Sequence, residues 1–457
     1  MGFLQGCTRP LLAITLGLGL IAQAPAATGA ELSPLVKAGS PDQWVFAFKL
    51  NARKFPTKLS DAGGDCLYGG DKMTAGAVGQ RYFMASKGSP TLKDGPGQIG
   101  TSDQDPLGAT FGQIYTGKYH YIVWNDQFDD QPLVHGGERA TGTWAHAKGM
   151  VAWDEDGHGV VIQVTTPDWP RSASQAFPRK NEGNTLGCMA HNNVIFSQHF
   201  FALKLSHADV KKVLNALQTA SVVTDTSMKV DPHTGKKVPV YPELFNNGGP
   251  PDIQLAATNV GVAQSTTTTA TLDKLDSGVE LIAKPSDLWA PPWQVVSSML
   301  EGEPLRVANW WGPKPKDQPV PDTKAGETHT CWPKGQGPGD VSTVHGGVWD
   351  TTDFNLELAT PQNGDGNHAK IGISAKNAKQ LVIFGDENQA GFLDPGQGDT
   401  CEHSQFKRGG LFFVVASPKL WTGLDAAFKE GAADGGAVND KAAPAPRHRR
   451  PRTKPTS

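Results

Sequence analysis

Short stretches in which apolar and polar residues alternate recur along this chain and predict a protein rich in β-strands. Residues 43–50 and residues 119–124 are two such stretches in the first half of the sequence. Helices are expected less often. A polar start at Ser206, followed by apolar residues at helical spacing, predicts a helix that ends near Val223.

The second half repeats this mixture. Two prolines predict the start of a short helix over residues 291–299, and residues 305–310 then read as a strand. A last helix is expected over residues 420–430. Residues 230–259 are rich in Pro, Gly and Asn and read as the connection between the halves. This alternation of helices and strands is typical of an α/β sandwich.

The tripeptide His-Ala-Lys occurs twice, at residues 146–148 and 368–370, each time at the predicted start of a strand. Because side chains alternate along a strand, the histidine and the lysine of one copy should point to the same side. A polar turn and a second apolar strand follow each copy, at residues 160–164 and 381–384. We therefore interpret the chain as two similar halves.

Paired imidazole and ammonium groups suit the cleavage of a phosphodiester without a metal. One histidine can attack phosphorus, the other can protonate the leaving oxygen, and the lysines can stabilise the charge. The candidate catalytic residues are His146, Lys148, His368 and Lys370, and no cofactor or metal is expected. The alternative is that the histidines are ordinary core-edge residues and that the lysines lie on the surface.

The first thirty residues, 1–30, read as a cleavable secretory signal. Arg9 precedes an apolar stretch at residues 11–22, which is too short to span a bilayer, and small residues follow it. This pattern predicts a protein that is secreted or exported to a bacterial periplasm.

Four cysteines remain after removal of this signal. An even number in an exported chain favours disulfides, and one bridge in each half, Cys66 with Cys188 and Cys331 with Cys401, is preferred among three possible pairings. Zinc binding is the competing use of these residues, although no Cys-x-x-Cys or His-Glu-x-x-His spacing occurs.

Charge is unevenly distributed along the chain, whose net charge is −3. Residues 441–457 carry six basic residues and no acidic one among Pro and Ala, so a basic disordered tail is expected over residues 433–457. The rest of the chain is acidic and holds most of the 13 histidines. Protonation of these histidines in acid should raise the affinity for nucleic acid.

Read in order, residues 119–127, the two His-Ala-Lys tripeptides, residues 385–389 and Arg408-Gly409-Gly410 resemble the deoxyribonuclease II family. The similarity runs over residues 43–415. It implies the phospholipase D fold, in which two α/β halves related by pseudo-twofold symmetry each contribute one His-x-Lys to a shared site. The chain departs from the family at Gln163, where the family often has histidine, in its fewer cysteines and in its basic tail.

This resemblance implies an acid endonuclease that hydrolyses DNA without a metal. His146 would attack to form a phosphohistidine and His368 would protonate the leaving 5′ oxygen, which leaves 3′-phosphate ends; the reverse assignment stays open. The two motif lysines would hold the non-bridging oxygens. Asn388, with Asp386 orienting a neighbour, would complete the phosphate-binding site.

The predicted organisation is a signal at 1–30, one half at 31–225, a second at 226–432 and the tail. DNA is the expected partner, with no membrane and no obligatory protein partner. Four alternatives stay open: a ribonuclease, a phospholipase, a non-catalytic protein that binds nucleic acid through its tail, and a metal-dependent nuclease that uses the histidines of Val-His-Gly-Gly at 134–137 and 344–347.

Overall fold

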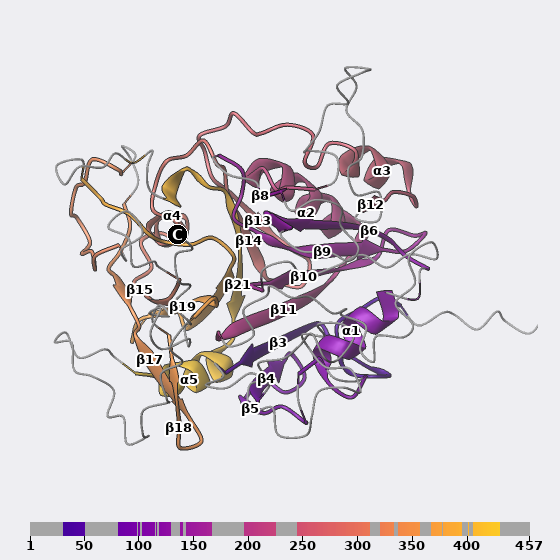
Figure 1. Cartoon of the computed structure of the whole chain (residues 1–457), viewed down its shortest axis with the longest axis horizontal. Coiled ribbons are helices and arrows are strands. Elements are labelled where there is room, and N and C mark those ends of the chain that lie inside the picture. Colours follow the sequence, from indigo (N-terminus) through magenta and orange to yellow (C-terminus); the bar gives the residue numbers. More distant parts are fainter. Residues whose placement is uncertain are drawn as a thin grey trace, which may run out of the picture. The chain divides into compact units, whose positions relative to one another are not determined.

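Two large β-sheets contain most of the predicted strands (Figure 1). The computed structural model describes residues 31–50, 81–97, 99–100, 103–114, 116, 118–128, 138–139, 143–166, 196–224, 245–310, 320–332, 337–356, 367–376, 378–394, 401 and 405–429. Several predicted features lie outside these residues: the signal, the basic tail, Cys66, Cys188 and the first Val-His-Gly-Gly at 134–137.

The first sheet has eight strands, all of them paired antiparallel. In spatial order they are β12 (Phe245–Asn246), β6 (His120–Asn125), β9 (Lys148–Trp153), β10 (Gly159–Val164), β11 (Gln198–Leu205), β3 (Trp44–Lys49), β4 (Tyr82–Ser86) and β5 (Lys93–Asp94).

The second sheet has seven strands, of which only β15 and β16 pair in parallel. In spatial order they are β13 (Thr271–Lys274), β14 (Glu280–Lys284), β21 (Gly410–Ala416), β20 (Leu381–Gly385), β19 (Lys370–Ser374), β15 (Leu305–Ala308) and β16 (Val341–Thr343).

Smaller elements flank these sheets. The short strands are β1 (Leu35–Lys37), β2 (Ser40–Pro41), β7 (Gln127–Phe128), β8 (Glu138–Arg139), β17 (Gly346–Trp349), β18 (Thr352–Asn355) and β22 (Phe428–Lys429). The helices are α1 (Pro106–Ile114), α2 (His207–Ala220), α3 (Pro251–Ala257), α4 (Pro292–Met299), α5 (Pro418–Ala427) and a 3-10 turn at Gln405–Lys407. No helix among the described residues is long and apolar enough to cross a membrane.

The central strands have the same order in both sheets. β6-β9-β10-β11-β3 in the first corresponds to β15-β19-β20-β21-β14 in the second, and a helix follows both β11 and β21. The chain is therefore an α/β protein with two sheets, as the sequence predicts. The pseudo-twofold symmetry and the boundary between the halves stay predictions.

The core explains how the sheets are held. One buried cluster joins residues of both sheets with α2 and α5, and in it the ring of Phe384 from β20 stacks on Phe46 at 4.7 Å and on Phe201 at 4.5 Å. α1 packs on the other face of the first sheet and α4 on the other face of the second. The two sheets thus share a continuous apolar core.

Most predicted elements are present, with local differences. The hydroxyl of Ser206 accepts a hydrogen bond from the backbone N–H of Asp209 and caps α2, as expected. The last helix begins and ends earlier than predicted, at Pro418 and Ala427. Treating all of residues 230–259 as a connection is wrong, because they include β12, which pairs with β6, and α3, which contacts α2.

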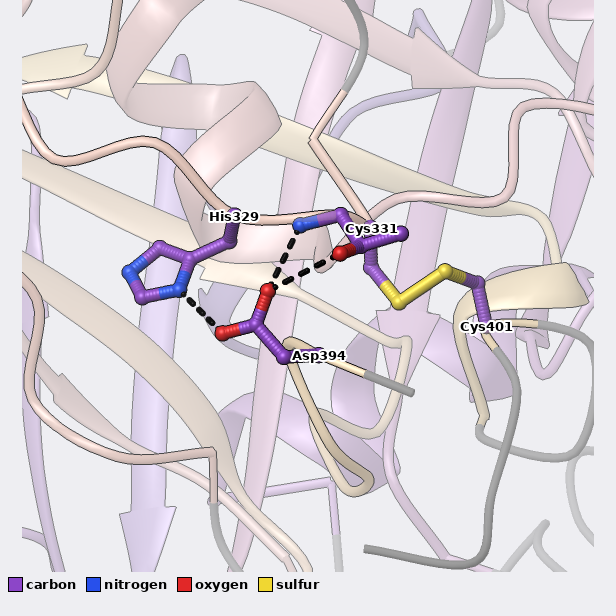
Figure 2. Close-up of a disulfide and its surroundings, with 5 residues drawn as sticks. His329, Cys331, Asp394 and Cys401 are labelled. Atoms are coloured by element: carbon purple, nitrogen blue, oxygen red, sulfur yellow. Dashed lines mark hydrogen bonds and ion pairs between the residues drawn. A yellow bond between two sulfur atoms is a disulfide. The ribbon is translucent and has the colours of Figure 1, made fainter. Parts of the chain in front are cut away.

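The predicted bridge between Cys331 and Cys401 is present (Figure 2). Beside it, Asp394 accepts hydrogen bonds from Nδ1 of His329 at 2.8 Å and from the backbone and hydroxyl of Thr330. Cys401 and Asp394 belong to the connection between β20 and β21. The disulfide therefore ties this connection to the segment that contains Cys331.

Candidate active site

The two His-Ala-Lys tripeptides lead into β9 and β19, which occupy corresponding places in the two large sheets. β9 begins at Lys148 and β19 at Lys370, so the prediction that each tripeptide starts its strand is wrong by two residues. The alternation nevertheless continues through them. Ala145, Ala147 and Ala369 belong to the main core, while the histidines and lysines between them do not.

His146 is held by the other half of the chain. Its Nδ1 lies 3.0 Å from the backbone carbonyl oxygen of Asp386, which can only accept, so Nδ1 carries the hydrogen. Nε2 consequently presents a lone pair. It lies 3.5 Å from Nζ of Lys148 and 3.4 Å from Nδ2 of Asn388. The backbone N–H of His146 donates to the carbonyl of Gly409 at 3.0 Å.

Lys148 forms a buried ion pair with Asp126, a residue that was not predicted to belong to the site. Its Nζ donates to Oδ1 of Asp126 at 2.9 Å, and the side chains are 2 % and 3 % exposed. The other carboxylate oxygen of Asp126 accepts from Nη2 of Arg408 at 2.7 Å. Arg408 also donates to the carbonyl oxygens of Trp144 and Ala145, immediately before the first motif histidine.

Both glycines after Arg408 have a steric reason, since a side chain at Gly410 would meet Cβ of Glu387. A side chain at Gly409 would collide with the backbone carbonyl of Ala220, at the end of α2. Glycine thus allows the start of β21 to approach α2 closely. This approach brings Arg408 to the first motif.

His368 has different surroundings. Its backbone N–H donates to the carbonyl of Ser197 at 2.8 Å. Its half-buried ring contacts Phe196, with centroids 4.5 Å apart, and Trp310, with centroids 6.4 Å apart. Within the described ranges no hydrogen bond to this ring is found, so aromatic contacts hold it in place.

Lys370 is buried beside this ring. Its Nζ donates to the carbonyl oxygen of His368 at 2.7 Å, and its backbone N–H donates to Nδ1 of His199 at 3.3 Å. His199 in turn lies 3.5 Å from the amide oxygen of Gln163, whose Nε2 donates to the carbonyl of Leu411. Where the family often has histidine, Gln163 therefore links the first half to β21.

Charged groups of each motif shift pKa values in the other. Burial, followed by the charges of Lys370, Lys148 and His146, lowers the pKa of His368 well below its usual value. Burial also lowers the pKa of His146, and the cations around it act in the same direction against the opposing charge of Asp126. The pKa of Lys370 is lowered by burial and by Lys148. The two tripeptides, more than two hundred residues apart, thus act on each other directly.

The pKa values of the two buried carboxyl groups, Asp126 and Asp386, shift in opposite directions because their surroundings differ. Burial would raise the pKa of Asp126, but its interactions with His146, Lys148 and Arg408 outweigh burial and hold this pKa far below its usual range. Asp386 is buried as well, and burial raises its pKa to about 7 because the nearby hydrogen bonds and lysines oppose it only in part. Below pH 7 the site therefore contains one carboxylate among several cations.

One group of side chains among the described residues could hold a metal ion, namely Asp154, Asp156 and His158. They form the turn between β9 and β10, at the end of β9 opposite to the first motif. The backbone N–H groups of Asp156 and His158 already bond Oδ1 of Asp154. The group accordingly has a structural explanation as a turn.

The six site residues predicted from the sequence all lie in this region. His146, Lys148, Asp386 and Asn388 are in direct contact or linked through His146, while His368 and Lys370 are joined to them electrostatically. Asp126 was not among the predicted site residues. The sequence offered one signal for Asp126 and Arg408, which is their position: the former directly follows β6, and the latter lies shortly before β21.

The first motif and Asp126 lie in a region of the chain that is similar to a known protein family. The family profile described as Deoxyribonuclease II matches residues 69–312, which is more than half of the chain. The matched range includes the first tripeptide and Asp126 and ends before the second. Among curated proteins, no sequence matches this chain.

Proposed function

The chain belongs to the deoxyribonuclease II family and is therefore an acid nuclease that hydrolyses DNA, and we propose that it does so without a metal through the two histidines of its paired motifs. In this mechanism, Nε2 of His146 attacks phosphorus and forms a phosphohistidine. His368 protonates the leaving 5′ oxygen and then activates the water that releases a 3′-phosphate end.

The observation that carries this assignment is the difference between the two rings. The carbonyl of Asp386 fixes the tautomer of His146, so that Nε2 keeps its lone pair and its direction. Burial lowers the pKa of His146, and the nearby cations lower it against the opposing charge of Asp126, which favours the neutral form that a nucleophile needs. The ring of His368 is held only by aromatic contacts among the described residues, which leaves its nitrogens available for proton transfer.

The lysines supply the positive charge that phosphoryl transfer needs. Lys148 has three N–H donors and uses one for Asp126, so it can also donate to a non-bridging oxygen. Lys370 and Asn388 would contact the same group, since Nδ2 of Asn388 lies 3.4 Å from the attacking nitrogen. A bound phosphate offsets the cations that lower the pKa of His368, so substrate binding in acid favours its protonated form.

The test is cleavage of plasmid DNA at pH 5 in millimolar EDTA, with analysis of the product ends. We expect nicking with 3′-phosphate ends, which a polymerase extends only after a phosphatase has acted. H146A and H368A should each lose at least a hundredfold in rate while H158A, an exposed histidine on the distant turn, retains activity. Activity that requires an added metal, or full activity in H146A or H368A, would refute the proposal.

A substrate with an activated leaving group separates the two roles. Thymidine 3′-(p-nitrophenyl phosphate) releases p-nitrophenolate, which needs no proton donor. H368A should release a burst of one equivalent of p-nitrophenol, and H146A should release none. The opposite pattern would reverse the assignment of nucleophile and acid.

A further inference from the structure

A buried triad of charges, Lys148, Asp126 and Arg408, lies beside His146. The Asp126 carboxylate accepts from the ammonium of Lys148 on one oxygen, at 2.9 Å, and from the guanidinium of Arg408 on the other, at 2.7 Å. Asp126 is 3 % exposed. Breaking a buried pair of this kind leaves an uncompensated charge, so each member depends on the others for its position.

The second half offers an internal comparison for this triad. In the first half, Asn125 lies opposite Lys148 in the β6–β9 register, so Asp126 comes one residue later. In the second half, Ala308 lies opposite Ile371, which places Trp310 at the position that corresponds to Asp126. Trp310 contacts the ring of His368 instead of bonding a lysine.

The partner of Asp126 follows the same correspondence. Arg408 precedes Gly409, whose carbonyl accepts from the backbone of His146, and Phe196 precedes Ser197, whose carbonyl accepts from the backbone of His368. Phe196 also contacts the ring of His368. The same two positions are therefore charged around the first motif and aromatic around the second.

This difference changes what holds each lysine. Nζ of Lys370 donates to a backbone carbonyl of its own motif, whereas Nζ of Lys148 is held by the side chain of Asp126, which directly follows β6. Bound to Asp126, Nζ of Lys148 lies 3.5 Å from Nε2 of His146, next to the place where phosphorus must be attacked. Arg408 fixes Asp126 and, through two carbonyl oxygens, the chain that leads into His146.

We propose that Asp126 is a positioning residue that holds the Lys148 ammonium at the attacking nitrogen and acts on the reaction only through Lys148. This inference rests on the proposed function, because it assigns Lys148 to the transferred phosphoryl group. Asp126 itself touches neither the substrate nor the reacting atoms. Its carboxylate compensates Lys148 and Arg408 and fixes the direction of the Lys148 donors.

The test is a double-mutant cycle between D126N and K148M, measured as kcat on a short DNA duplex at pH 5. Removal of one preorganised hydrogen-bond donor to a transition-state oxyanion lowers kcat by about 10²–10³, and we expect D126N and K148M each to fall in this range. Since Asp126 acts through Lys148, the double variant should be no slower than K148M. Losses that multiply in the double variant would overturn the proposal.

Two further variants separate positioning from folding. D425N removes the carboxylate of the partly buried Arg306–Asp425 ion pair between β15 and α5, and it should lower the urea midpoint without lowering kcat more than twofold. D126E keeps the charge but moves the carboxylate by one methylene, so it should fold and show a kcat between those of wild type and D126N. If D126E and D126N both have the wild-type kcat, the proposal is overturned.

The same assay distinguishes failure of this inference from failure of the proposed function. If H146A or H368A is fully active, the proposed mechanism itself is wrong. If both are inactive while D126N retains the wild-type kcat, the mechanism stands and only the role of Asp126 is refuted.

Discussion

The buried carboxyl group of Asp386 should make the protein more stable in acid than in mild alkali. Burial raises its pKa to about 7 in the folded protein, whereas the unfolded chain has a pKa of about 3.9. A carboxyl whose pKa is raised by folding contributes stability that is fully present below the unfolded pKa. This stability is lost as the pH rises through the folded pKa.

The size of the effect follows from these two values. The difference of about three pH units corresponds to about 4 kcal/mol in the free energy of unfolding, at 1.36 kcal/mol for each unit. Of this, about 2.6 kcal/mol is lost between pH 5 and pH 8. D386N removes the titration and keeps an oxygen for the hydrogen bond from the backbone N–H of Leu411.

The assay is urea unfolding of wild type and D386N at pH 5 and pH 8, followed through the fluorescence of the 12 tryptophans. Other groups titrate in both proteins and cancel in the difference. We expect D386N to gain roughly 2–3 kcal/mol relative to wild type on going from pH 5 to pH 8. A difference between the two proteins that changes by less than about 0.5 kcal/mol would show that Asp386 is already ionised at pH 5.

Two other predictions concern the acid dependence and the disulfide. Because the pKa of His368 is lowered by burial and neighbouring cations, the rate of DNA cleavage should rise from neutral pH toward about pH 5, and a maximum above pH 8 would contradict a histidine acid. The Cys331–Cys401 bridge spans 70 residues, so the C331S/C401S variant should lose about 4 kcal/mol of unfolding free energy by chain entropy. A loss below about 1 kcal/mol in urea unfolding would show that other contacts already fix the β20–β21 connection.

Strands and helices with a strong apolar pattern could be predicted from the sequence because their burial matches that pattern. β3, β10 and β20 are buried throughout, and α2 begins where its serine cap predicts. Residues 245–257 were read as a connection because Pro, Gly and Asn dominate there. Pairing of β12 with β6 depends on the tertiary structure, and local composition does not record it.

The site could be predicted in part for a related reason. The histidines and lysines were found because a motif occurs twice in order, and the cysteine pair because the count is even. Asp126 was missed because its role depends on Arg408, which is 282 residues away in the sequence. The residues that neighbour Asp126 in the sequence give no sign of an ion pair with a partner so far along the chain. The sequence showed each partner beside a strand but gave no reason to join them.

The contacts around the two motifs also explain why the site needs both sheets. His146 of the first motif donates hydrogen bonds to the carbonyl oxygens of Asp386 and Gly409, at the two ends of the connection between β20 and β21. His368 of the second motif donates a hydrogen bond to the carbonyl oxygen of Ser197, directly before β11 in the first sheet. Each histidine is thus held by the sheet that does not contain its own motif.

This exchange makes the position of each histidine a consequence of sheet packing. Phe384 stacks on both Phe46 and Phe201, so the apolar contact between the sheets lies close to the hydrogen bonds that hold the motifs. A fragment that ends at residue 312 would contain His146 and Lys148 but would lack Arg408 and the carbonyl of Asp386. His146 would then lose its fixed tautomer and Asp126 one of its two cations. The geometry around both motifs therefore depends on both sheets, and neither half alone can hold its own motif in position.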